Sequence, residues 1–290
     1  MRRFHHFAAL DWSGARGERQ QGIALAIASG DAAPQLVRPG HRWSRMEICD
    51  WIAEQARLKS DLLIGFDFSS ALPFHDHGSY FPSWPESPQD ARALWALVER
   101  LSAEDPHLEA TSFLQHPEIH RHFRHGGGIV GDLFEGGGGR LRFVEHYQRQ
   151  SGQASSISNL SLVGPAQVGK ASLTGMRMLH RLHSIVPLWP LDPLPDRGPA
   201  MMESYTSLAA RAAGLPKGRS KIRTGEALNE ALAALHCPPT PHHGPISDHQ
   251  SDALLTAAWI RLCASQSRFW TPPALTPEIA AQEGWTFGII

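Results

Sequence analysis

The sequence contains few cysteines, few charged residues and no long apolar run. Its three cysteines, Cys49, Cys237 and Cys263, are far apart and form no Cys-x-x-Cys pair, which argues against a disulfide framework and a thiolate zinc site. This usage fits a reducing compartment, so we expect a cytoplasmic protein. No stretch approaches the roughly 18 uninterrupted apolar residues of a transmembrane helix, so we expect no membrane partner.

An excess of charge of one sign is also missing. The chain has 27 Lys and Arg against 28 Asp and Glu, a formal net charge of −1, and thus no global positive field for nucleic acid or anionic lipid. Charged residues make up 19% and hydrophobic residues 42%, which excludes a disordered segment and a charged coiled coil. We expect a globular, enzyme-like chain in which any nucleic-acid binding is local.

The apolar pattern of residues 1–73 predicts the element order β-β-β-α-β. Ser44 and Glu47 form a capping-box pattern at the start of the expected helix. The continuous apolar run 62–68 is typical of a strand buried on both faces. The three strands before the helix are expected at 4–12, 21–29 and 35–43.

A regular pattern resumes in the last part of the chain. Between the two parts, residues 74–164 are rich in Pro, Gly and His, which predicts an insertion with helices and Gly-rich loops. We therefore expect one α/β domain, a mixed central sheet flanked by helices, built from residues 1–73 and 165–290. Its later elements are expected to be strands at 186–189 and 200–204, helices at 208–213, 226–235 and 248–263, and a docking tail at 285–289.

Carboxylates end two of the expected strands. Asp11 shares one strand face with Phe7 and Ala9, and Asp67 shares one with Leu63 and Gly65, because side chains alternate with period two. Each acid therefore closes an apolar row. Ligand sites of open α/β sheets lie at the carboxyl ends of strands, so two acids there indicate a functional site.

The last expected helix and a short strand add further acids. Asp248 and Asp252 begin the apolar stripe of the helix 248–263, and His249 lies next to Asp252 on the helix surface. Glu203 ends the apolar run 200–202. A proton-carrying or metal-binding imidazole beside carboxylates would suit acid-base chemistry.

Several acids that meet in a core need protons or a cation, because like charges raise each other's pKa. Mg²⁺ or Mn²⁺ prefers oxygen ligands, and two such ions can activate water and stabilise the leaving oxygen in phosphodiester cleavage. Singly, the acids have structural explanations: Asp11 could shape a turn, Asp67 could cap the next segment, and Asp248 could cap its helix. The functional interpretation depends on the set.

These residues resemble the RNase H-like superfamily, and the motif His249-x-x-Asp252-Ala253 is closest to the RuvC-like Holliday-junction resolvases. Within it, the chain resembles the family of predicted RNase H-fold nucleases catalogued as domain-of-unknown-function family 429, over residues 4–73 and 165–290. The motifs that carry this resemblance are Leu10-Asp11-Trp12-Ser13-Gly14, Gly65-Phe66-Asp67-Phe68-Ser69, Glu203-Ser204-Tyr205-Thr206-Ser207 and Ser251-Asp252-Ala253-Leu254.

The resemblance implies two-metal phosphodiester hydrolysis. Asp11 would bridge both ions, Asp67 and Glu203 would each hold one, and Asp252 would complete the second site with His249 or Asp248 beside it. Two alternatives stay open: a phosphotransferase or ATPase of the related actin-like fold, and a non-catalytic interaction protein on the same scaffold.

Basic residues and histidines supply candidate contacts. Lys170 is a candidate phosphate contact, and so is a cationic strip that could hold a nucleic-acid backbone. Its members are Lys217, Arg219, Lys221 and Arg223. Four histidines at 116–125 could form a zinc site, but the glycines that follow favour a solvated loop.

Overall fold

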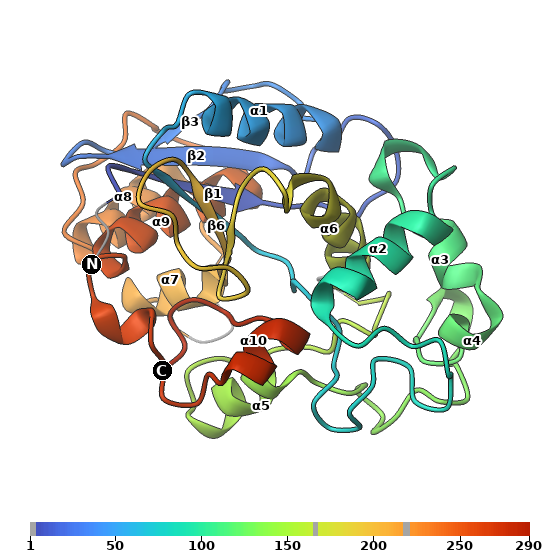
Figure 1. The fold of residues 1–290 in the computed structure, drawn as a ribbon. Helices are drawn as coiled ribbons and strands as arrows, with labels where there is room; N and C mark the ends of the chain where they lie inside the picture. Colours follow the sequence, from blue (N-terminus) through green and yellow to red (C-terminus); the bar gives the residue numbers. More distant parts are fainter. Residues whose placement is uncertain (1–3, 165–167, 217–220) are drawn as a thin grey trace.

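A six-stranded mixed sheet forms the centre of the computed structural model, which describes residues 4–164, 168–216 and 221–290 (Figure 1). The strand order is β3-β2-β1-β4-β6-β5. β2 pairs antiparallel with β1 and β3, whereas β1, β4, β6 and β5 run parallel. The strands are β1 (His6–Asp11), β2 (Ala24–Ser29), β3 (Gln35–Leu36), β4 (Leu62–Phe66), β5 (Leu188–Trp189) and β6 (Ala200–Glu203).

The predicted order β-β-β-α-β is confirmed for the first part of the chain. Helix α1 (Arg45–Arg57) begins after Ser44, which forms the predicted capping box with Glu47. Strand β3 is much shorter than the predicted 35–43, because Arg38 adopts a positive φ of 52° and breaks the extended backbone.

Helices cover both faces of the sheet. On one face α9 (Asp248–Cys263) packs against β1 and β2, with α7 (Thr206–Ala212) and α8 (Gly225–Ala234) beside it; α1, α2 (Ala91–Leu101) and α6 (Val168–Leu182) belong to the other face (Figure 1). The pleat separates two apolar clusters: Phe7, Ala9 and Leu63 lie on the α9 side, and Leu10 and Ile64 on the other. Helix α9 has the predicted bounds.

Helix α6 was not predicted, because its glycines interrupt the apolar period. Gly169 packs against the backbone of the segment before it, and at Gly175 a Cβ would lie only 2.3 Å from the ring of Phe68. Both glycines thus let α6 approach its neighbours closely, which compensates for their low helix propensity. The loop after β1 approaches α6 at Gly14 in the same way.

The segment 74–164 shares the core of the sheet domain. Its buried Phe81, Trp95 and Phe113 belong to the same apolar cluster as Leu10 and Ile64, and Figure 1 shows α2 to α4 grouped at one end of the sheet. The remaining helices of this segment are η1 (Pro106–Leu108), α3 (Thr111–Gln115), α4 (Pro117–His120), η2 (Gly126–Gly128) and α5 (Phe143–Gln150).

The chain ends in the predicted docking tail. After η3 (Ser267–Phe269) and α10 (Pro277–Glu283), Trp285, Phe287 and Ile289 are buried, and the Phe287 N–H donates to the Glu203 carbonyl at 2.9 Å. None of the described helices is long and apolar enough to cross a membrane.

Candidate functional site

Asp11 and Asp67 lie side by side at one edge of the sheet. Asp11 is the last residue of β1, Asp67 follows β4, and these parallel strands pair Leu10 with Phe66. The backbone N–H of Trp12 donates to Asp67 Oδ1 at 2.8 Å, which ties the two strand ends together. Asp11 is buried and Asp67 half-buried.

The first turn of α9 brings the other predicted residues to this edge. Ser247 caps the helix and forms a capping box with Gln250, which fixes the orientation of the turn. His249 Nδ1 lies 3.3 Å from Asp11 Oδ1, and the histidine side chain is 48% exposed. Asp252 is half-buried, and it and Asp248 are near enough to Asp11 to act on its pKa.

The pKa values of three of these acids are raised. Burial raises the pKa of Asp11 well above its usual range, and the charges of Asp252 and Asp248 add to this. Burial, with the charge of Asp11, raises the pKa of Asp67 in the same way, partly offset by the Trp12 N–H. Burial and the charge of Asp248 raise the pKa of Asp252 to about 6.

Asp248 differs from the other three acids. It accepts from Lys221 Nζ at 2.8 Å and pairs with Arg223 Nη2 at 3.3 Å, and these bonds lower its pKa, with Lys221 the main cause. Among the described residues, no Lys or Arg forms an ion pair with Asp11, Asp67 or Asp252. We call these three the acidic cluster.

The donor chemistry of the acidic cluster fits a hard divalent cation. Carboxylate oxygens are the ligands that Mg²⁺ and Mn²⁺ prefer, and a cation would relieve the mutual repulsion of these acids. Within the described ranges, no three His, Cys, Asp or Glu side chains are already arranged as a metal site. The cluster therefore offers suitable ligands that would have to reorient to share an ion.

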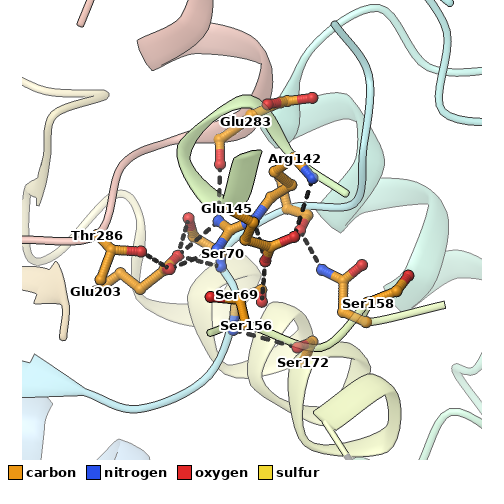
Figure 2. A network of polar contacts seen from close by, with 12 residues as sticks. Ser69, Ser70, Arg142, Glu145, Ser156, Ser158, Ser172, Glu203, Glu283 and Thr286 are labelled. Atoms are coloured by element: carbon orange, nitrogen blue, oxygen red, sulfur yellow. Dashed lines mark hydrogen bonds and ion pairs between the residues drawn. The ribbon is translucent and has the colours of Figure 1, made fainter. Parts of the chain in front are cut away.

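Glu203 lines a small cavity together with Asp67, but its carboxylate is paired with a buried arginine. Figure 2 shows that its carboxylate accepts from Arg142, Ser70 and Thr286. Arg142 is held in turn by the Glu145 carboxylate at 3.0 Å. Burial would raise the pKa of Glu203, but the Arg142 guanidinium and the other donors lower it below its usual range.

The pleat of β6 places Glu203 and Asp11 on different faces of the sheet. Glu203 follows Met201 on the face opposite α9, whereas Asp11 shares the α9 face with Ala9. Glu203 ends a strand as Asp11 does, but a strand end in the sequence does not fix the face of the sheet on which the side chain lies. Its partner Arg142 was not predicted, because no local pattern distinguishes this arginine from exposed ones.

The described basic candidates come from two separate segments near the acidic cluster. Lys221 and Arg223, both 70% exposed, stand beside Asp248. Lys170 lies in the first turn of α6, where its main chain contacts Gly14 of the loop after β1. Lys217 and Arg219 lie outside the described residues.

The structure thus places Asp11, Asp67, Asp252, Asp248 and His249 together, whereas Glu203, which lines one small cavity with Asp67, is paired with Arg142. Comparison of the chain with models of protein families, with curated proteins and with solved structures finds no match in any of the three.

Proposed function

We propose that the chain is a divalent-metal-dependent nuclease with an RNase H-like fold. The proposal depends chiefly on one observation: three acids with raised pKa values and no Lys or Arg ion pair among the described residues gather where β1, β4 and α9 meet. Such a site is unfavourable without a positive ligand, and perturbed carboxylates in one place are typical of functional sites.

Asp11, Asp67 and Asp252 would hold Mg²⁺ or Mn²⁺. The bound metal would activate water and stabilise the leaving oxygen of a phosphodiester. Trp12 keeps Asp67 in place through its N–H. His249, in contact with Asp11 and half in solvent, is suited to carry a proton between the site and bulk water.

Cations around the cluster favour a phosphate-bearing substrate. Lys221 and Arg223 are exposed on one side and Lys170 lies on another, so a nucleic-acid backbone could be held across the acids despite the neutral total charge. Glu203 has a different part in this proposal. Its ion pair with Arg142 and its bond to Ser70 fix the chain that follows Asp67, so it supports the site by holding this segment in place.

The RNase H-like assignment is supported by the strand order. An antiparallel β1-β2-β3 meander continues through a parallel β4 into a mixed sheet, as expected from the resemblance of the motifs around Asp11 and Asp67. A phosphotransferase would instead require ATP for its activity, and an interaction protein would respond to no metal. Both alternatives are outcomes of the experiment below.

The experiment measures cleavage of end-labelled single-stranded DNA, RNA, duplexes and a four-way junction with Mn²⁺, with Mg²⁺ and with EDTA. We expect metal-dependent cleavage of at least one substrate by the parent, and its loss in Asp11→Asn and Asp252→Asn. Asp50→Asn, which changes an exposed acid on α1, is the matched control and should cut like the parent. Equal cleavage by all variants would mean that Asp11 and Asp252 do not take part in the reaction.

A further inference from the structure

A cavity of about 280 Å³ opens beside the acidic cluster. Its walls come from the loop after β1, from α3, from the α4–η2 region and from α6. Its floor is apolar: Leu162 and Leu173 are buried and Leu114 is half-buried. The side chains of His120 and His125 stack at 3.9 Å between ring centroids and add flat aromatic surface to the wall.

Three polar side chains of this cavity, from Thr111, Gln115 and Lys170, have no partner among the described residues. The Thr111 hydroxyl and the Gln115 amide make no side-chain hydrogen bond to another described residue, and half-buried Lys170 has no acidic partner there. A lysine of the lining that has no ion-pair partner among the described residues favours an anion at this cavity.

The cavity is joined to the acidic cluster by short connections. Gly14, in its wall, is three residues from Asp11, so their Cα atoms lie at most about 10 Å apart. The Trp12 indole N–H donates to the wall residue Thr174 at 2.9 Å, while the Trp12 backbone N–H donates to Asp67. One molecule could therefore place a phosphate near the acids and its attached group in the cavity.

We propose that this cavity receives one unpaired nucleobase of the substrate and that Lys170 contacts the phosphate attached to it. The inference rests on the proposed nuclease function and names its substrate class: a strand with an exposed base, either single-stranded or extruded from a duplex. An apolar floor with a few uncommitted donors and acceptors matches a heterocycle that stacks and hydrogen-bonds at its edge.

Size and charge support this choice. The volume lies just below the range of small-molecule sites, which begins near about 300 Å³, so the cavity has room for a single base. Arg16 and Lys170 are cationic residues of the lining, and the carboxylate of Glu109 already accepts from the Gly17 N–H at 2.9 Å. With two cations against one carboxylate, the lining favours a phosphate over a further cation.

The test is calorimetric binding of adenosine monophosphate, adenosine and inorganic phosphate to the metal-free 290-residue chain. We expect the monophosphate to bind more tightly than either part alone. Leu114→Trp, which places a larger side chain in the cavity, should weaken monophosphate binding about tenfold or more. This is the loss expected for one stacked base. Ile185→Trp, which changes an exposed isoleucine outside the lining, is the matched control and should bind like the parent.

Lys170→Gln provides a second measurement that does not alter the apolar floor. It should weaken binding of the monophosphate and leave binding of adenosine unchanged. The inference is overturned if the parent does not bind the monophosphate in the millimolar range. It is also overturned if neither Leu114→Trp nor Lys170→Gln weakens that binding.

A cleavage assay distinguishes failure of this inference from failure of the proposed function. Metal-dependent cutting without monophosphate binding refutes the cavity assignment alone. Monophosphate binding sensitive to both variants, in a chain that cuts no nucleic acid, refutes the nuclease and leaves the base-binding cavity standing.

Discussion

Asp252→Asn should stabilise the metal-free protein at neutral pH. Asp252 is half-buried and accepts no hydrogen bond from a described residue, and its pKa is raised from an ordinary 3.8 to about 6. The folded protein therefore binds the Asp252 proton more tightly than the unfolded chain does. Ionisation of this group opposes folding, and the asparagine variant removes that opposition.

The size of the effect follows from the pKa shift. A shift from 3.8 to about 6 corresponds to roughly 3 kcal/mol of folding free energy at most, and solvent contact of the half-buried side chain reduces this to about 1–3 kcal/mol. The parent loses this contribution as pH rises from about 4 to 6, and the full penalty is present above pH 6. The variant should thus gain about 1–3 kcal/mol at pH 7.5 and almost nothing at pH 4.

Urea unfolding of parent and variant in EDTA, at intervals between pH 4 and 8, measures this difference. The gain in the free energy of unfolding should grow through pH 4–6 and then level off. Asp50→Asn should show no such pH-dependent gain. A variant that is less stable than the parent at pH 7.5, or equally stabilised at every pH, would refute the view that Asp252 is an uncompensated acid.

Three further predictions test other parts of the structure. Glu203→Gln should destabilise the fold by about 3–5 kcal/mol in urea unfolding at pH 7, because it leaves the buried guanidinium poorly neutralised; a neutral effect would contradict the structural role of this acid. Gly14→Ala should lower stability by about 1–3 kcal/mol, since its Cβ would lie 2.3 Å from the backbone of α6; an unchanged unfolding midpoint would contradict this close contact. The pair Lys221→Ala and Arg223→Ala should weaken nucleic-acid binding in a filter or anisotropy assay and reduce the salt slope by about 1 for each charge removed; an unchanged slope would remove both from the interface.

Local signals predicted much of the fold. The capping pattern at Ser44 located α1, and the capped apolar stripe from Asp248 located α9. Helix α6 was not predicted, because its glycines have low helix propensity. Tertiary contacts compensate for them, such as the ring of Phe68 against Gly175. Such compensation cannot be seen in a local window of sequence.

The site was predicted only in part, because the positions of some of its residues depend on contacts between distant segments. Asp11 and Asp67 end adjacent parallel strands, so their meeting follows from strand order and pleat. Glu203 also ends a strand, but its register places it on the opposite face, and its cation Arg142 comes from a segment 61 residues away. The half-buried Lys170 and the cavity beside it depend on how four separate elements pack, which no spacing in the sequence reveals.

Thermal unfolding with and without millimolar Mn²⁺ tests the central claim most directly. If the acidic cluster binds the ion, the melting temperature of the parent should rise, by the equivalent of about 2.7 kcal/mol when Mn²⁺ is a hundredfold above its dissociation constant. Asp11→Asn should lose most of that rise, whereas Asp50→Asn should keep it. Two results would contradict the assignment of a metal to this edge of the sheet. The melting temperature of the parent would not change with Mn²⁺, or that of Asp11→Asn would rise as much as that of the parent.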